Sequence, residues 1–474
     1  MSNKLTLSAS DRISSLLDEA SFVEVGAYVT ARSTDFNMQE TDTPKDGVIT
    51  GYGVMNGKLV YVYSQDASVL GGAIGEMHAK KIAKIYDMAM KVGAPVIGLI
   101  DCAGLRLQEA MDALNAFGEV YAKQTLASGV IPQITAIFGT CGGGAALIPT
   151  LTDFTFMTAE GGKLFVNSPN ALDGNNQAKL DTASASYLSE NSSLVDGVFE
   201  DDMAVLGQIR ALVDLLPSNN MEDATVDATD DLNRIIPNLD GFAKDARAVL
   251  QNLADNNAFF EIKKDYAKDM VLGLMRLGGA TVGCVANQVA DGGDMLSTGG
   301  AYIAADFVKF CDAFNIPVLT LVNAKGFVAT VSNERTVADA AAKLTFAYAD
   351  ATVPKVTVVM GDAFGTAYTI MNSKAIGADM VYAWPCAKIG TMDPEMAVKI
   401  MYDKELAAAE DKLAVMNEKK KEYTELQSSA IAAAKRGYID DIIEPDATRK
   451  RVIAAFEMLA TKDEVRPYKK HGAV

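Results

Sequence analysis

The stretch QITAIFGTCGGGAA, residues 133–146, places three consecutive glycines directly after an apolar, β-branched run. Such a run is typical of a buried strand, whereas glycine is costly inside a helix or strand. Three glycines together indicate a turn at which backbone amides approach another group closely. The pattern returns in the second half of the chain as KVTVVMGDAFGTAY, residues 355–368.

A second pair of segments repeats at the same offset in residue number. VIGLIDCAG at 96–104 parallels VLTLVNAKG at 318–326. The offset aligns three pairs of glycines: Gly104 with Gly326, Gly139 with Gly361, and Gly143 with Gly365. Two echoes at one offset predict an internal duplication. Because buried strands alternate with helical patterns in both halves, each copy is predicted to be an α/β domain.

The periodicity of the chain predicts the elements that flank these segments. We expect a short helix and strand over 11–25, a hairpin over 47–64 around Asn56-Gly57, and helices over 75–92, 108–127 and 403–459. The polar, acidic stretch 217–237 begins and ends with proline and predicts an interdomain linker. The predicted domains are therefore residues 1–220 and 239–474.

Composition limits the classes of partner and compartment. A net charge of −18 argues against nucleic acid or an anionic membrane as the main partner. The five cysteines form no CxxC pair, so neither a metal site nor a disulfide framework is predicted. The start shows no signal-peptide pattern and the apolar runs are too short to span a bilayer. A cytoplasmic setting is expected.

Histidine is scarce, which limits the chemistry. The chain has His78, in a predicted amphipathic helix, and His471, in a basic tail. A Ser-His or Cys-His nucleophile would need one of them. We therefore expect an enzyme of this sequence to work without imidazole.

The glycine turns allow three interpretations. The first is close packing of helix on strand. The second is nucleotide binding, but the third glycine of GxGxxG is missing after Gly142, and no GK[ST] follows for a P-loop. The third is an oxyanion hole, because the first amides of a helix lack intrahelical acceptors and can stabilise a developing negative charge. That chemistry needs no histidine.

Longer stretches carry a resemblance to a known family. GGGAALIPTLTD, from Gly142, resembles the crotonase-superfamily turn that donates an amide to a thioester enolate. Over nearly its whole length the chain is similar to the carboxyltransferase subunit of biotin-dependent acyl-CoA carboxylases and transcarboxylases. The matching stretches are DGVITGYGVMNGKLVYVYSQD, LGGAIGEMHAKKI, GAPVIGLIDCAGLRLQE, LASGVIPQITAIFG, FVKFCDAFNIPVLTLV, ATVPKVTVV, AKRGYIDDIIEPDATRKRV and RPYKKHG.

The resemblance implies a fold, a reaction and partners. It implies two tandem crotonase-like (β-β-α superhelix) domains, with acyl-CoA on the N-terminal domain of one subunit and biotin on the C-terminal domain of another. A carboxyl group would move between carboxybiotin and the α-carbon of a short acyl-CoA through an enolate. Substrate and cofactor would supply the base. A homodimer or hexamer, a separate biotin carboxyl carrier protein, and a biotin carboxylase or membrane decarboxylase subunits are the implied partners.

The resemblance also implies site residues. Gly143 and Gly144 would donate amides to the thioester oxygen. On the biotin side the family pattern places the amides on Thr366 and Ala367, whereas the internal repeat places them on Gly365 and Thr366. Gly142, Gly104, Gly365 and Gly326 would shape the turns for substrate, and Thr369 occupies the position of an acyl-chain contact. No metal is implied.

The second half departs from the family in two places. Threonine stands at 366 where the family has glycine, and the segment AKGFVATVSNERTVADAAAK, residues 324–343, lacks the family's PGF and RHGAK motifs. Within that segment, Lys325 stands where the family has the PGF proline. An unusual biotin side, or a weakly active subunit, is expected from them.

Other functions and sites were weighed on the same residues. A carboxyltransferase subunit of a sodium-pumping decarboxylase uses the same chemistry in reverse. A crotonase-type hydratase would need placed glutamates, for which Glu109 and Glu119 are candidates that fit a solvated helix face equally well. An inactive scaffold is a third class. AMKV, residues 89–92, resembles a biotin-attachment motif but lies in a helical pattern. Candidate cations for CoA phosphates, each equally a surface charge, are Arg32, Lys45, Lys80, Lys81 and Arg106.

Overall fold

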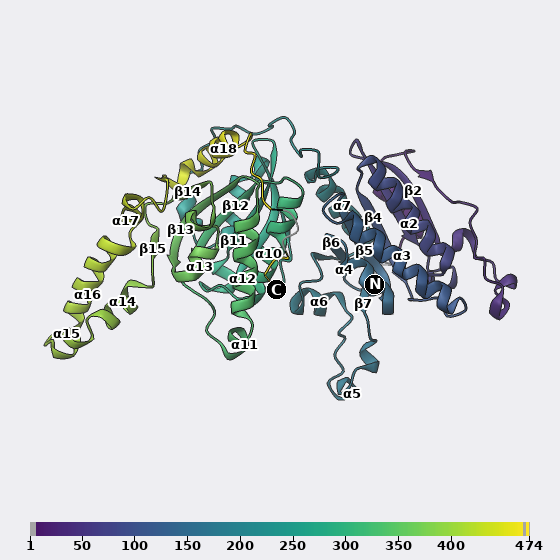
Figure 1. Ribbon diagram of the computed structural model, residues 1–474, viewed down its shortest axis with the longest axis horizontal. Coiled ribbons are helices and arrows are strands. Elements are labelled where there is room, and N and C mark those ends of the chain that lie inside the picture. The colour runs from purple at the N-terminus through teal and green to yellow at the C-terminus, as the bar shows by residue number, and fades with distance from the viewer. Residues whose placement is uncertain (1–5, 468–470, 474) are drawn as a thin grey trace. The chain divides into compact units, whose positions relative to one another are not determined.

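A computed structural model describes residues 6–467 and 471–473 of the chain. Part of the RPYKKHG motif, and the outermost residues of both predicted domains, lie outside the described residues. The chain divides into two compact units, Met1–Ala224 and Thr225–Val474 (Figure 1). Which unit serves acyl-CoA and which serves biotin stays a prediction.

The first unit contains an eight-stranded sheet in the order β1-β2-β3-β4-β5-β6-β8, with β7 paired to β5. Its strands are β1 (Val23–Glu24), β2 (Val48–Met55), β3 (Lys58–Gln65), β4 (Val96–Cys102), β5 (Gln133–Gly142), β6 (Phe154–Thr158), β7 (Lys163–Phe165) and β8 (Gly197–Phe199). Its helices are α1 (Ala9–Leu16), α2 (Glu76–Val92), α3 (Ala110–Ala127), α4 (Leu147–Thr150), α5 (Asn175–Ala178), α6 (Ala185–Asn191) and α7 (Asp202–Leu215). The strands from β3 to β6 are parallel.

Local sequence explains these elements. The β2–β3 hairpin turns at Asn56 and Gly57, whose φ angles of +51° and +80° suit a type I′ turn. Helix α2 ends at Gly93, which adopts the left-handed conformation that glycine tolerates. The predicted hairpin, the helices over 75–92 and 108–127, and the parallel strands are confirmed.

The second unit repeats the sheet in the order β16-β14-β13-β12-β11-β10-β9, with β15 paired to β13. Its strands are β9 (Phe259–Ile262), β10 (Met270–Leu277), β11 (Ala280–Asn287), β12 (Val318–Ala324), β13 (Lys355–Phe364), β14 (Met380–Ala383), β15 (Lys388–Gly390) and β16 (Asp441–Ile442). Its helices are α8 (Ala246–Leu253), α9 (Val289–Gly292), α10 (Thr298–Ala313), α11 (Val331–Glu334), α12 (Val337–Asp350), α13 (Gly365–Ile370), α14 (Pro394–Met401), α15 (Asp403–Ala408), α16 (Lys412–Tyr423), α17 (Ala430–Lys435) and α18 (Thr448–Met458).

The offset between the two sequence copies, which aligns Gly143 with Gly365, holds across the fold. Strands β10, β11, β12 and β13 and helix α10 each begin at the position that this offset gives from the first residues of β2, β3, β4, β5 and α2. Even the isolated bridge Ile74–Leu105 has its counterpart in Leu296–Phe327. In Figure 1, α2 and α3 run side by side in the first unit, as α10 and α12 do in the second. The predicted duplicated α/β fold is confirmed.

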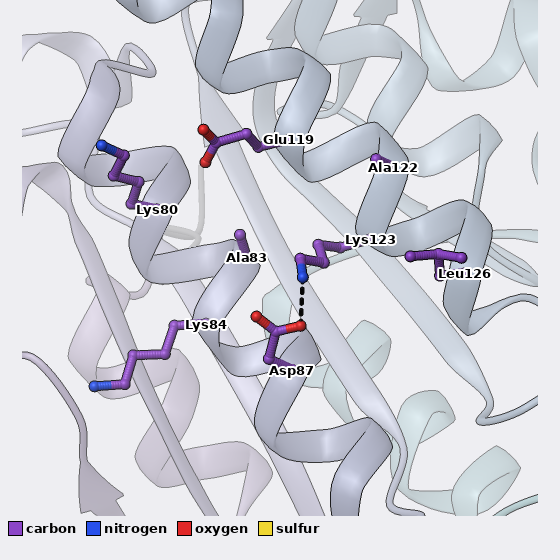
Figure 2. Close-up of a pocket in the computed structure, with 8 residues that line it drawn as sticks. All are labelled: Lys80, Ala83, Lys84, Asp87, Glu119, Ala122, Lys123 and Leu126. Atoms are coloured by element: carbon purple, nitrogen blue, oxygen red, sulfur yellow. Dashed lines mark hydrogen bonds and ion pairs between the residues drawn. The ribbon is translucent and has the colours of Figure 1, made fainter.

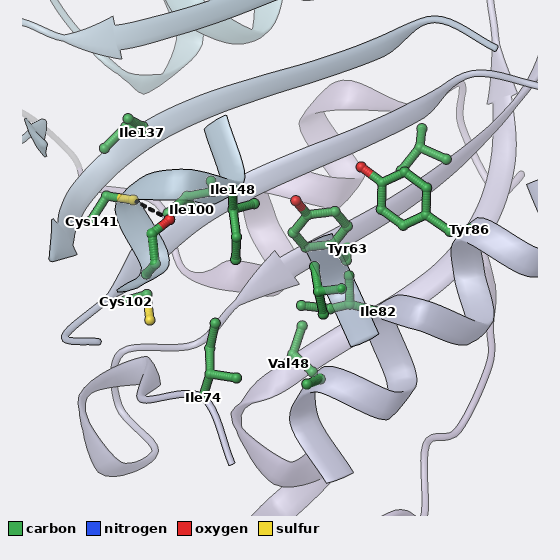
Figure 3. Packing of buried hydrophobic residues seen from close by; sticks show 14 of the residues in the cluster. Val48, Tyr63, Ile74, Ile82, Tyr86, Ile100, Cys102, Ile137, Cys141 and Ile148 are labelled. Atoms are coloured by element: carbon green, nitrogen blue, oxygen red, sulfur yellow. Dashed lines mark hydrogen bonds between the residues drawn. The ribbon is translucent and has the colours of Figure 1, made fainter. Parts of the chain in front are cut away.

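The core of the first unit lies between the sheet and helices α2 and α3. Tyr63, Ile100 and Cys141 from the strands pack with Ile82 and Tyr86 of α2 (Figure 3). All five are at most 1% exposed. This core holds the carboxyl ends of β4 and β5 at fixed positions, and the glycine turn follows directly from β5.

Two sequence expectations need correction. From Thr225 onward, the stretch expected as a linker is packed on the second unit: Thr225 bridges Ala280, Ile236 is buried, and the Asp231 carbonyl accepts a hydrogen bond from Arg449. The 403–459 region, expected as helices, also contains strand β16. The sequence did not indicate this strand, because two residues are too few to show a periodicity. Among the described residues, no helix has the length and apolarity needed to cross a membrane.

Candidate functional site

The first glycine turn follows β5 without an intervening loop. Gly143–Ala146 form a 3₁₀ turn that leads into α4. Gly143 has φ +63°, and a side-chain carbon built on it would meet no atom within 4 Å. The amides of Gly143 and Gly144 open this turn, so they have no intrahelical acceptor. Gly143 and Gly144 are both partly exposed, and the Cβ side of Gly143 faces open space.

The second glycine turn has the same backbone at its start. Gly365 opens α13 directly after β13, again with φ +63°. Thr366 is exposed, whereas Ala367 is fully buried. A side-chain carbon on Gly365 would approach the Thr391 carbonyl at 3.2 Å, so this cradle is narrower than the one at Gly143. The equal φ angles match Gly143 to Gly365 and Gly144 to Thr366.

A side chain on the preceding strand holds each turn. Asp101 at the end of β4 accepts a hydrogen bond from the Thr140 amide, and Asn323 in β12 accepts one from the Asp362 amide at 3.1 Å. Each also excludes a side chain at the glycine opposite it: a Cβ on Gly139 would collide with Asp101 and a Cβ on Gly361 with Asn323. These contacts explain why Gly139 and Gly361 recur in the repeat.

The loops after β4 and β12 contain the other two predicted glycines. Gly104 has φ +116° and lies against the Gly142 carbonyl. The predicted residues Gly104 and Gly142 therefore form one close backbone contact. Gly326 lies near the Met295 sulfur, in a loop whose Phe327 bridges Leu296. Thr369 lies one helical turn after Gly365, and its hydroxyl donates to the Gly365 carbonyl at 3.3 Å. The predicted site residues therefore gather in two clusters, one in each unit.

A buried ion cluster anchors the loop of the first unit. Arg106 donates to Asp46 at 2.5 Å and to Glu109 at 2.7 Å, and all three side chains are at most 2% exposed. Glu109 also accepts the Glu76 amide at 2.6 Å and so caps helix α2. Burial raises the pKa of Asp46, with Arg106 opposing that rise. Glu109 is thus a buried structural group, and the expectation of a solvated helix face was wrong for it.

An amide side chain does the corresponding work in the second unit. Asn333 accepts the Thr298 amide at 2.8 Å and donates to the Val328 carbonyl at 2.8 Å. Residue 298 is the repeat equivalent of residue 76, so Asn333 caps α10 as Glu109 caps α2. Around Asn333, the segment 324–343 is therefore anchored to α10 through uncharged hydrogen bonds.

Lys325 adds charge to the second cluster. Its ammonium lies 2.7 Å from Asp294 and 3.8 Å from Asp362, which shortly precedes Gly365 in the chain. The Asp294 contact and the neighbouring carboxylates raise the pKa of Lys325, which stays protonated. The equivalent residue in the first unit is Ala103. The two turns therefore share a backbone but differ in electrostatic surroundings.

Histidine and cysteine side chains near the first turn are buried and uncharged. His78 contacts Gln65 and Asp46, and burial lowers its pKa to about 3. Burial raises the pKa of Cys102 to about 11, and the Cys141 thiol donates to the Ala145 carbonyl. His471 is exposed. His78 and Cys141 are thus engaged in buried contacts within the first unit.

Of the candidate CoA cations, two are buried in structural contacts. Lys81 donates to the carbonyls of Lys45 and Val48, and Arg106 belongs to the ion cluster. Lys80 lines a cavity of about 490 Å³ between α2 and α3, together with Glu119 and a Lys123–Asp87 ion pair (Figure 2). The cavity brings the candidate cation Lys80 and the candidate glutamate Glu119 together, and none of the glycines of the two turns lines it.

Tyr121, near the first turn, was not predicted from the sequence. The Tyr121 hydroxyl, on α3, donates to the Gly144 carbonyl at 2.6 Å. Its spacing from Phe117 predicts only a helix face, and the two rings stack 5.8 Å apart. Nothing in the sequence indicates that the phenol reaches a turn so far along the chain.

Comparison with known proteins was consistent across sequence and structure. The family described as Carboxyl transferase domain matches residues 3–474. The alpha subunit of methylmalonyl-CoA decarboxylase from Propionigenium modestum is 42% identical, covering 100% of this chain and 93% of that protein. The propionyl-CoA carboxylase beta chain of Roseobacter denitrificans is 43% identical over 99% and 93%. A transcarboxylase 12S crystal structure, described as a hexamer assembly with methylmalonyl-coenzyme A bound, superposes with TM-score 0.94 at 37% identity, covering 98% and 92%.

Proposed function

Because this chain belongs to the carboxyl transferase domain family, we propose that it moves a carboxyl group between biotin and the α-carbon of a short acyl-CoA. The single observation that carries the proposal is the pair of glycine turns, one in each copy of the repeat, with equal φ angles at Gly143 and Gly365. Two oxyanions arise when a carboxyl group passes between a thioester and a ureido group. A duplicated turn provides one set of donors for each.

On the acyl-CoA side, the proposed donors are the amides of Gly143 and Gly144. They would bind the thioester oxygen and stabilise it as charge develops on it during enolisation. Preorganised donors of this kind are worth about 10²–10³-fold in rate each. The first unit, with Gly104 and Gly142 closing the turn, would hold this half of the site.

On the biotin side, the proposed donors are the amides of Gly365 and Thr366, with Ala367 next in the helix. A side chain at position 365 would crowd the Thr391 carbonyl, so glycine keeps the backbone of this turn uncovered. When bound, biotin supplies the transferable carboxyl group and a basic ureido nitrogen. The chain itself would supply the oriented donors. His78 is not proposed as the base, because it is buried in contacts with Gln65 and Asp46. A separate carrier protein would deliver the biotin, because Lys91 of the AMKV motif lies on helix α2.

We propose methylmalonyl-CoA and propionyl-CoA as the substrate pair, because the named relatives act on these thioesters. The test incubates the full chain with malonyl-, methylmalonyl- or glutaconyl-CoA, with and without free biotin, and follows the thioesters by chromatography. Biotin-dependent loss, fastest for methylmalonyl-CoA, is expected. Loss that ignores biotin, or no loss of any of the three, would contradict the proposal.

A second physiological role fits the same chemistry. The relative from Propionigenium modestum is a decarboxylase subunit, which supports a place in a membrane decarboxylase that consumes methylmalonyl-CoA. Native purification separates the roles: a biotin carboxylase would co-purify in one case and an integral membrane subunit in the other.

The proposed assembly is a homodimer at least, and a hexamer by similarity to the transcarboxylase 12S structure. In it, acyl-CoA on one subunit would face biotin on another. Light scattering coupled to size exclusion tests this; a monomer with full activity would contradict it.

A further inference from the structure

The glycines that open the first turn have no side chains to hold them. Gly142, Gly143 and Gly144 follow in sequence, and the Cβ direction of Gly143 points into open space. Glycine has more accessible backbone conformations than any other residue, so such a turn loses the most entropy when it is fixed. Donors that move at the moment of reaction lose much of their value, because preorganisation is what makes them effective.

Tyr121 reaches the turn from another element. Its hydroxyl donates to the Gly144 carbonyl at 2.6 Å, and its oxygen lies 3.2 Å from where a Cβ on Gly144 would stand. The ring is partly buried and stacks on Phe117 of the same helix. Helix α3 is itself packed on the core through Phe117 and Val120. The phenol therefore connects the Gly144 backbone to helix α3, which is packed on the core.

Among the described residues, no side chain makes the corresponding connection to the second turn. Its residue equivalent to Gly144 is Thr366, which has a side chain, and its first carbonyl accepts from Thr369 of the same helix. Lys343, the repeat equivalent of Tyr121, instead pairs with Asp339 at 3.0 Å. Within the described part of the chain, a phenol from a neighbouring helix thus bonds to the turn that opens with Gly143 and Gly144, and none bonds to the turn that opens with Gly365 and Thr366.

We propose that Tyr121 is a positioning residue that locks the Gly143–Gly144 turn in its donor geometry; the kinetic consequence rests on the proposed function. The phenol touches neither of the two donor amides. It fixes the next peptide group, and through it the direction in which the Gly144 amide points.

The test compares Tyr121→Phe with Tyr86→Phe. Tyr86 is a matched control because its hydroxyl accepts a hydrogen bond from Gln124 of α3 but does not touch the turn. Amide hydrogen exchange of residues 142–147, followed by mass spectrometry in the free protein, needs no enzymatic activity. Biotin-dependent loss of methylmalonyl-CoA gives kcat and KM, and thermal unfolding reports global stability.

In Tyr121→Phe we expect exchange of the turn amides to quicken by roughly three- to tenfold, as for loss of one hydrogen bond. We expect kcat to fall by a similar factor, with KM for the thioester within about twofold of wild type. Tyr86→Phe should leave both exchange at the turn and kcat unchanged. Faster exchange in a chain without carboxyltransferase activity would support the lock and refute the proposed function.

Unchanged exchange at the turn in Tyr121→Phe would overturn the proposal. So would a fall in kcat that Tyr86→Phe reproduces, or one matched by a proportionate loss of thermal stability, because a general weakening of α3 would then explain it.

Discussion

The two glycine turns have one backbone and two kinds of support. Gly143 and Gly365 share φ +63°, and the strands before them are held by equivalent contacts from Asp101 and Asn323. Around the first turn lie the buried ion cluster of Arg106 and the Tyr121 phenol. Around the second lie the Asn333 cap of α10 and the partly exposed ion pair of Lys325 with Asp294. After duplication, the side chains have diverged while the position of the amides has not.

The largest expected effect comes from breaking the buried cluster of the first unit. Arg106→Met leaves Asp46 and Glu109 buried without their cation, which costs about 3–5 kcal/mol of unfolding free energy. Asn333→Ala, which removes the corresponding cap in the second unit, should cost only about 1–2 kcal/mol. Urea unfolding at pH 7 measures both.

The deficit of Arg106→Met should shrink as pH falls, since a protonated carboxyl costs less to bury than a carboxylate. Equal costs for the two variants would show that the charged and uncharged anchors are energetically alike.

Gly143→Ala breaks the shared backbone at the first turn. The added methyl group meets no atom, but alanine at φ +63° is strained by about 1–2 kcal/mol. Relief of that strain should rotate the amides, and kcat should fall by about 100-fold, as for loss of an oxyanion donor. Steady-state kinetics measures the fall. A variant as active as wild type would mean that the turn does not need its left-handed residue.

Lys355→Gln makes a buried position of the second unit like its equivalent, Gln133, in the first. Lys355 donates to the Tyr348 and Ala351 carbonyls, and burial lowers its pKa to about 8. The unfolded chain holds this proton to about pH 10, so raising the pH from 8 to 10 favours the folded state by at most about 2 kcal/mol. Lys355→Gln has no such proton, so between pH 8 and pH 10 its free energy of unfolding should rise less than that of the wild type by this amount. Denaturation at pH 8, 9 and 10 tests it; parallel profiles would contradict it.

The smallest effect is expected at Lys325. Its ion pairs with Asp294 and Asp362 are partly exposed, so Lys325→Met should cost no more than about 1 kcal/mol. Because the ammonium lies beside the second turn, KM for biotin should change while KM for the thioester does not. Steady-state kinetics with biotin and the thioester varied separately would show this. A change in KM for the thioester alone would contradict the proposed position of Lys325 beside the biotin.

Sequence reasoning succeeded where the physical signal is local or periodic. The run of apolar residues before Gly139 and the Asn56-Gly57 turn determine strands and a hairpin almost by themselves. The glycine pairs at one offset indicated both turns, because only a few residue types adopt a positive φ.

The supports of the site were not predictable in the same way. Glu109 follows exposed residues and precedes a helix, and its burial becomes visible only when Arg106 and Asp46 meet in space. The Tyr121 hydroxyl and the Asn333 amide oxygen bond to residues 23 and 35 positions away in the chain. The choice between Gly365–Thr366 and Thr366–Ala367 stays a prediction, because the family pattern and the internal repeat differ by one residue.

The central claim is that the two turns hold different oxyanions, and ligand binding to two matched variants tests it most directly. Equilibrium dialysis would measure methylmalonyl-CoA and biotin binding to Gly143→Ala and Gly365→Ala. The account predicts that Gly143→Ala weakens only the thioester and Gly365→Ala only biotin. Weakening of the same ligand by both variants would contradict it.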